Sequence, residues 1–136
     1  MKYKGLVGLA VMSGLFLVAI PARAHHSSAA EFNVLKEISL SGTITRVDWI
    51  NPHSYIYVDV KDNSGKVTNW GLETEPPRIL RQYGLKREMF VVGQTLDVTL
   101  NPAKDPGKSI GFIRHLKFQD GDEININNHY VVDDSK

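Results

Sequence analysis

The sequence predicts an all-β fold with one short helix, arranged as a small OB-type Greek-key barrel of about five to six strands. Apolar residues recur at every second position in several segments rich in Val, Ile, Thr, Tyr and Trp, which is the period of a half-buried strand. Turn residues separate these segments, and the strong helix pattern falls between the third and the fourth, where this kind of barrel carries a helix that plugs one end. A small open sandwich would produce the same alternation, so the order of the elements favours the barrel without excluding the sandwich.

The first strand is predicted over residues 37–49 from the alternation of apolar and polar side chains. Its inward-facing positions are Ile38, Leu40, Gly42 and Ile44. Between Ile44 and Val47 the alternation slips by one residue, which predicts a β-bulge at residues 45–46 that lets a long strand bend around a barrel.

The remaining elements follow from alternation and turn chemistry. Asn and Gly tolerate the positive φ that tight turns need, so residues 62–65 predict a hairpin turn between the second and third strands. A helix is predicted over residues 76–84, because proline suits the first helical turn and Gly84 suits the left-handed cap at its end. The predicted strands after the first are 55–60, 66–73, 96–100, 109–118 and a short one at 124–126.

The first 24 residues have the pattern of a cleavable secretory signal. Lys2 and Lys4 precede an uncharged apolar run of 16 residues, and Ala22-Arg23-Ala24 supplies the small residues that signal peptidase requires. A retained membrane anchor is the alternative, but 16 residues are fewer than the roughly 20 that span a bilayer core. We therefore expect an exported, periplasmic or secreted protein that begins at His25, with no stable membrane anchor after cleavage.

The predicted organisation is a cleaved signal peptide at 1–24, an N-terminal extension at 25–36, one OB-like β domain at 37–126 and a flexible tail at 127–136. Removal of the signal leaves 112 of the 136 residues, enough for one small core. The mature chain would carry 13 Lys and Arg against 15 Asp and Glu, a net charge of −2. This balance argues against a nucleic-acid partner, and the count of zero cysteines excludes disulfides and thiolate metal sites.

Three stretches of the sequence are distinctive in combination: His25-His26-Ser27-Ser28-Ala29-Ala30-Glu31-Phe32, then the string from Gly42 that ends in Trp49-Ile50-Asn51-Pro52-His53, and Gly65-Lys66-Val67-Thr68-Asn69-Trp70. In these stretches the chain resembles a family of small exported bacterial proteins that is catalogued as a domain of unknown function. The resemblance implies export and a compact β domain, and it implies no catalytic residues. Function must therefore be inferred from the chemistry of individual side chains.

The first functional hypothesis is a copper site at the mature terminus. Cleavage after Ala24 would give His25 a free α-amine beside its own imidazole, and these two nitrogens can chelate one metal ion. A third nitrogen from a distant histidine would complete a T-shaped histidine brace, which suits Cu(II) because that ion prefers tetragonal nitrogen ligation, whereas zinc does not. His26 offers a second route through the amine, its own backbone nitrogen and its ring.

The candidate distant ligands of such a site are His53 and His115, with His129 in the tail as a weaker choice. Glu31 is a candidate outer-shell acceptor that would orient a ligand histidine. The structural alternatives are an unconstrained terminus that binds no metal, a hydrogen-bonded His53 at a strand edge, and a solvated Glu31.

The second hypothesis is a metal-free module that binds an oligosaccharide or an envelope protein through an aromatic face, formed by Trp49, Tyr55, Tyr57 and Trp70. The alternation places the two tyrosines on one face with Asp59, whereas Trp70 has the pattern of a core residue. Catalysis is not expected, because Ser27 and Ser28 lack the glycines of a nucleophile elbow and no carboxylate pair stands at catalytic spacing.

Overall fold

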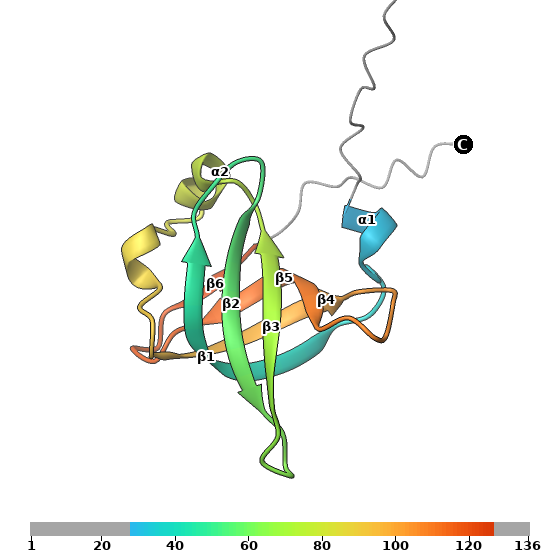
Figure 1. Ribbon diagram of the computed structural model, residues 1–136. Helices are drawn as coiled ribbons and strands as arrows, with labels where there is room; N and C mark the ends of the chain where they lie inside the picture. The colour runs from blue at the N-terminus through green and yellow to red at the C-terminus, as the bar shows by residue number, and fades with distance from the viewer. Residues whose placement is uncertain (1–27, 127–136) are drawn as a thin grey trace, which may run out of the picture.

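The computed structural model describes residues 28–126, which form a closed five-stranded β-barrel with a sixth strand at its edge (Figure 1). The predicted signal peptide and its cut site, His25 and His26, and the predicted tail with His129 lie outside the described residues. The elements are α1 (Ser28–Glu31), β1 (Ile38–Asp48), β2 (Ser54–Lys61), β3 (Val67–Thr74), α2 (Pro77–Gln82), the 3₁₀ helix η1 (Arg87–Met89), β4 (Thr95–Pro102), β5 (Ile110–Lys117) and β6 (Glu123–Asn125).

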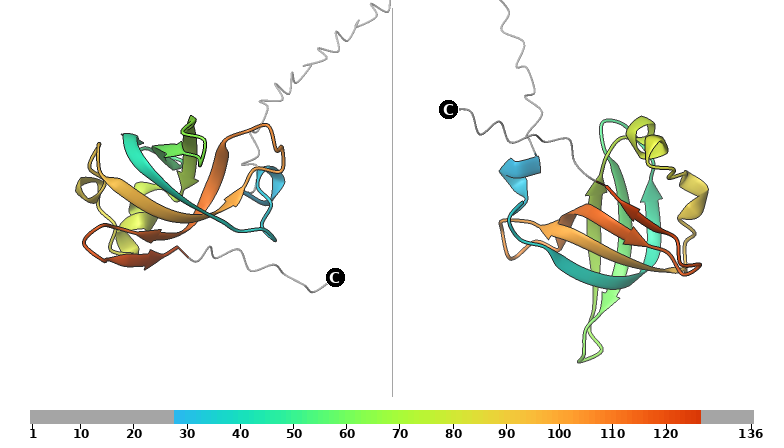
Figure 2. Two further views of the ribbon diagram at one scale, coloured as in Figure 1. Left: turned by 90° about the horizontal axis from the view of Figure 1, so that it is seen from below. Right: turned by 180° about the vertical axis from the view of Figure 1, so that it is seen from behind.

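The barrel is closed by a short parallel contact between β3 and β5. Strand β1 pairs antiparallel with β2 and β4, β2 pairs with β3, and β4 pairs with β5. The parallel contact joins Leu72 to Gly111 and Glu73 to Phe112, so the strands run β1-β2-β3-β5-β4 and back to β1. This order, with α2 between β3 and β4, confirms the predicted OB-type Greek-key barrel, and Figure 2 shows the barrel from below and from behind.

Strand β1 bends at the predicted bulge. The register between β1 and β2 shifts between Ile44 and Arg46, so that Thr45 is the extra residue. Residues before the bulge pair with β4, and those after it pair with β2 alone. The bulge therefore lets one continuous strand serve both halves of the barrel, as the slip in alternation predicted.

One apolar core fills the barrel. Its fully buried members come from every strand of the closed barrel and from the α2–η1 segment: Ile44, Ile56, Val58, Leu72, Leu80, Leu85, Phe90, Leu96, Leu100, Ile113 and Leu116 among them. Helix α2 contributes Leu80 and is followed by Gly84, whose φ of +82° is the left-handed value that favours glycine. The predicted helix is confirmed, although it spans Pro77–Gln82 only.

Two short helices were not predicted from the sequence. Helix α1 has four residues and η1 has three, and elements of this length have no apolar period to detect. None of the helices among residues 28–126 has the length and hydrophobicity of a membrane span.

The segment after α1 packs against the barrel. Phe32 is 1% exposed and its ring lies 5.8 Å from that of Phe112. The Asn33 N–H donates to the Pro102 carbonyl at 2.8 Å, and the Lys104 N–H donates to the Glu31 carbonyl at 2.9 Å. The described part of the predicted extension is therefore held at the ends of β4 and β5.

Candidate functional site

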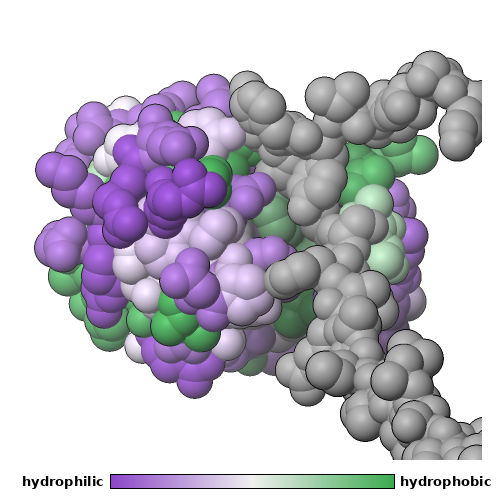
Figure 3. Space-filling model, turned by 90° about the horizontal axis from the view of Figure 1, so that it is seen from above, coloured by the Kyte–Doolittle hydropathy of each residue, from purple (hydrophilic) through white to green (hydrophobic). Residues whose placement is uncertain are grey.

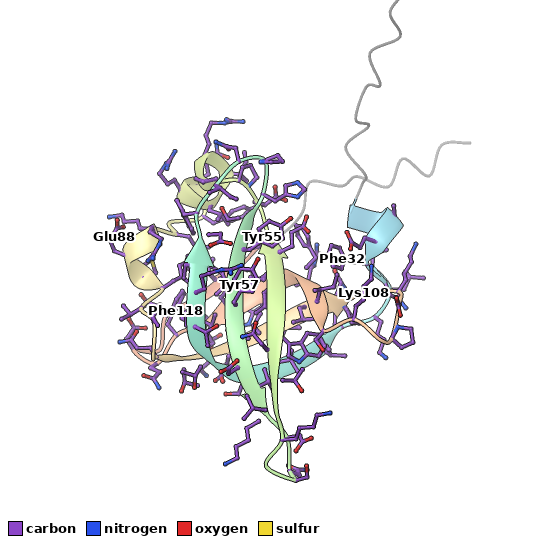
Figure 4. All side chains as sticks on the ribbon, in the orientation of Figure 1. Phe32, Tyr55, Tyr57, Glu88, Lys108 and Phe118 are labelled. Atoms are coloured by element: carbon purple, nitrogen blue, oxygen red, sulfur yellow. The ribbon has the colours of Figure 1, made fainter. Side chains whose placement is uncertain are left out.

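The candidate site lies on the outer surface of β2 and β3, next to α1. Alternate residues of β2 point into and out of the barrel: Ile56 and Val58 are fully buried, whereas Tyr55 and Tyr57 lie on the outer side and remain partly exposed. Figure 4 shows the two tyrosines one above the other on this strand. Their rings lie 6.4 Å apart and are nearly parallel, at 28°.

A histidine, a glutamate and a tyrosine form one hydrogen-bonded group on this surface. Glu73 of β3 is the register partner of Tyr55, and its Oε2 accepts a hydrogen bond from the Tyr55 hydroxyl at 3.2 Å. Its other oxygen, Oε1, contacts Nδ1 of His53. The Glu73 side chain is 14% exposed, so both contacts form in a partly dehydrated environment. With Nδ1 engaged, Nε2 is the His53 nitrogen available to an external ligand.

The surroundings of this group are acidic. Burial raises the pKa of Tyr55 to about 12, and the charge and hydrogen bond of Glu73 and the charge of Glu31 act in the same direction. Burial also raises the pKa of Glu75, with Glu73 adding to the shift and His53 opposing it. Glu73 contacts the His53 imidazole and the charge of Glu75 also acts on it, so two carboxylates lie close to one imidazole, an arrangement that favours a positive charge there.

Helix α1 is held beside the Glu73 side chain by packing. Phe112, which contacts Phe32, is the parallel register partner of Glu73. The Lys104 ammonium group donates to the Ala29 carbonyl at 2.6 Å, which ties the start of the described chain to the β4–β5 loop. The N-terminal segment and the His53 group therefore occupy neighbouring parts of the same surface.

The structure places His115 in a different environment. It lies on β5 in a groove of about 370 Å³ between β1, β4 and β5, which Ser39, Asp97 and Lys117 also line. Its Nε2 lies 3.6 Å from a carboxylate oxygen of Glu123 on β6. The two candidate distant ligands are thus on separate surfaces, and His53 is the one that lies on the surface where α1 packs.

The four aromatic residues of the second hypothesis do not share one face. Trp49 packs against Phe90, with ring centroids 5.8 Å apart, and Trp70 is the register partner of Val58 and packs against the core. The two tyrosines alone lie together on the outer surface of β2. The guanidinium carbon of Arg46 is 3.7 Å from the centre of the Tyr57 ring, so one of these two rings already carries a cation.

Sequence reasoning missed Glu73, although the hairpin contains the signal that would have found it. The turn at residues 62–65 sets Lys61 opposite Val67, and counting outward along both strands from that pair places Tyr55 opposite Glu73. An outward tyrosine facing a carboxylate could therefore have been predicted from the turn position alone.

Residues 28–126 contain no group of three His, Asp or Glu side chains arranged to hold a metal ion. The described residues offer at most part of a metal site. A complete site would require nitrogen ligands from His25 or His26, which lie outside them.

Comparison with known proteins agrees with the resemblance noted above. The sequence model of a family of unknown function, DUF6152, matches residues 14–114. No curated protein matches the chain.

Proposed function

The chain belongs to this family of unknown function, and from its own chemistry we propose that it is an exported, periplasmic binding protein that binds copper at its mature N-terminus. The proposed ligands are the α-amine and imidazole of His25 and Nε2 of His53. Export is supported by the basic start, the 16-residue apolar run and the Ala22-Arg23-Ala24 cleavage pattern.

The observation that carries the proposal is the contact between His53 Nδ1 and Glu73. Ligand histidines characteristically donate their second ring nitrogen to a carboxylate, which orients the ring and makes the ligating nitrogen more basic. The Tyr55 hydroxyl in turn holds Glu73 in place. His53 thus has the supporting contacts of a metal ligand before any metal is bound.

The position of α1 supports this ligand set. Three peptide units separate His25 from Ser28, and an extended chain covers roughly 3.4 Å per residue, so the terminus can lie anywhere within about 10 Å of Ser28. Packing of Phe32 and the hydrogen bond from Lys104 hold the following residues on the same surface as His53. Nitrogen ligation of this kind favours Cu(II) over zinc.

Copper titration of the mature chain tests the proposal. We expect a chain that starts at His25 to bind Cu(II) tightly, and a chain with one extra N-terminal alanine to bind it far more weakly, because the alanine moves the α-amine away from the His25 ring. Equal, weak affinity in the two chains would contradict the terminal site.

Histidine variants identify the third nitrogen. We expect His53→Ala to weaken Cu(II) binding and to change its electron paramagnetic resonance spectrum, whereas His115→Ala, the matched control on the other surface, should change neither. If the extra alanine abolishes binding but His53→Ala has no effect, the His26 route without the barrel is the correct one.

Glu73 is proposed as a positioning residue. Glu73→Gln should lower Cu(II) affinity by roughly 10- to 100-fold, the usual effect of removing such a partner, and should shift the copper spectrum because the His53 ring is no longer held. A purely structural role would lower thermal stability and leave the spectrum of the bound copper unchanged.

The alternative function is a metal-free module that binds an oligosaccharide or a protein partner. The parallel tyrosine rings on the outer face of β2 favour it, because strands 2 and 3 form the usual ligand-binding face of OB barrels. A glycan-binding screen of the metal-free protein and of a Tyr55→Ala, Tyr57→Ala double variant tests the module. Glycan binding by the metal-free protein that is lost in the variant would favour it.

A further inference from the structure

We propose that a second cavity, at the end of the barrel between β1 and η1, binds a small organic anion that joins a phosphate or carboxylate group to an apolar ring. The cavity has a volume of about 550 Å³, within the range of small-molecule sites. It is lined by Trp49, Arg81, Gly84, Leu85, Lys86, Arg87 and Glu88. This inference does not depend on the copper site.

The apolar part of the cavity is held in place by the core. Trp49 is half-buried, packs against the core and lies 5.8 Å from Phe90, which is 1% exposed. Leu85, which follows the left-handed Gly84, is completely buried. Leu85 supports this end of the barrel from the core, and the exposed part of the Trp49 indole ring is the surface on which a planar apolar group can pack.

The polar part of the cavity is strongly basic. Arg81, Lys86 and Arg87 line it against one acidic residue, Glu88. Residues 78–87 contain four basic residues and no acidic one, although the chain from residue 25 onward has a net charge of −2. Positive charge is therefore concentrated at this end of an otherwise slightly acidic protein.

These cations have no carboxylate partner within residues 28–126. The ion pairs within these residues are Arg46–Asp48, His53–Glu73, Arg114–Glu37, His115–Glu123 and Lys117–Glu123. Nη1 of Arg87 donates to the Phe90 carbonyl at 3.2 Å, which fixes the guanidinium group while its other N–H groups stay available. Two N–H groups of one arginine side chain can donate together to two oxygens of a carboxylate or phosphate group. A bound anion would therefore supply the negative charge that these side chains lack among the described residues.

The cavity lies away from the proposed copper site. Figure 4 shows Glu88 on the opposite side of the molecule from Phe32, which marks the N-terminal segment. Seen from above, the end of the barrel that carries α2 presents mostly hydrophilic side chains (Figure 3). The two sites can therefore be tested separately.

Phenyl phosphate is a suitable probe because it has one ring and one phosphate group. Binding is followed by the fluorescence of Trp49 in a Trp70→Phe variant, and in the unmodified mature chain by the NMR shift of the Trp49 indole N–H. We expect phenyl phosphate to bind about tenfold or more tightly than either phenol or inorganic phosphate, because each of these lacks one of the two contacts. If phenol binds as tightly as phenyl phosphate, the cavity is an apolar cleft only. If inorganic phosphate binds as tightly as phenyl phosphate, the cavity is a counter-ion site only. Either result overturns the proposal.

Charge variants locate the site. Arg81→Gln with Lys86→Gln should reduce phenyl phosphate affinity by about tenfold or more. The matched control, Lys61→Gln with Lys66→Gln, removes the same charge at the exposed β2–β3 turn and should leave the affinity unchanged. An equal loss in both pairs would show a general charge effect and contradict the assignment. Cu(II) affinity should be the same in both pairs, so that this proposal and the copper proposal can fail independently.

Discussion

At the scale of single residues, the turn between β2 and β3 depends on one carboxylate oxygen. Oδ1 of Asp62 accepts hydrogen bonds from the Ser64 N–H at 2.8 Å, the Ser64 hydroxyl at 2.6 Å and the Lys66 N–H at 3.0 Å. These bonds, the Ser64 hydroxyl first, hold the pKa of Asp62 below its ordinary value. A lowered pKa stabilises the fold above the pKa of the unfolded chain, and this stabilisation is lost as the pH falls through the folded value.

Removing the Ser64 hydroxyl should therefore raise the pKa of Asp62. In Ser64→Ala we expect the carboxyl carbon of Asp62 to titrate at higher pH in an NMR experiment, because the largest stabilising contact of the charged form is gone. Ser64→Thr keeps the hydroxyl and serves as the control. An unchanged titration in Ser64→Ala would show that the backbone N–H bonds alone set the pKa.

Gly111 allows the strands to approach one another where the barrel closes. A Cβ atom at this position would overlap the Leu100 side chain and lie 3.0 Å from the Asn101 carbonyl oxygen. Gly111→Ala should therefore lower the free energy of unfolding by about 1–3 kcal/mol, as overpacking does elsewhere. Urea denaturation measures it, with Gly71→Ala as control, because a Cβ there makes ordinary 3.5 Å contacts. Equal stability of the two variants would contradict this account.

At the scale of elements, the segment around Phe32 is the one whose position matters most for the proposed copper site. It is attached by the buried Phe32 ring, by backbone bonds to Pro102 and Lys104, and by the bond from the Asn101 amide to the Lys36 carbonyl at 2.8 Å. This attachment fixes where the start of the described chain lies on the barrel.

Phe32→Ala should release this segment locally. The Asn33 and Lys104 amides, which bond across the contact, should exchange with solvent faster by on the order of 100-fold, since truncating a buried phenylalanine costs about 3 kcal/mol or more. Hydrogen exchange followed by NMR measures this. Leu35→Ala is the matched control, because Leu35 is 95% exposed and should have no effect. Exchange rates that do not differ between the two variants would show that the backbone bonds hold the segment alone.

At the scale of the whole molecule, a closed barrel around one core should unfold cooperatively. The parallel β3–β5 contact joins the two halves, so neither half can keep its core when the other opens. Single domains of this size usually unfold in one step. We expect the loss of β circular dichroism and the change in tryptophan fluorescence to coincide on heating, with and without reductant, because the chain has no cysteine. Separate transitions would show that the barrel halves are independent.

Much of the fold could be predicted because it depends on neighbouring residues. The inward positions of β1, the bulge at Thr45, the hairpin turn and the glycine that ends the α2 segment are all confirmed. Each follows from side-chain alternation or from the allowed φ of one residue, and both are properties of a short stretch of chain. The same reasoning could not find η1, which is too short to show a period.

Two residues of the candidate site were predicted from the sequence, but the contacts between its residues were not. His53 and Tyr55 were named from the sequence, but their common partner Glu73 lies on another strand. Likewise, nothing in the local pattern separates His53 from His115. The alternation did separate the outward tyrosines from Trp70, but it did not show that Trp49 packs on Phe90. These distinctions depend on which strands meet, and so on barrel closure.

The sequence by itself therefore determined the strands, their inward faces, the bulge and the turns, because local sterics and hydrophobic alternation act within a few residues. Tertiary structure alone decided that β3 meets β5, that Phe32 packs on Phe112, and that His53 and Tyr55 share Glu73. Those contacts join residues far apart in the chain, up to the 80 positions that separate Phe32 from Phe112. They form because the barrel can bury its core only when it closes, and closure places these side chains side by side.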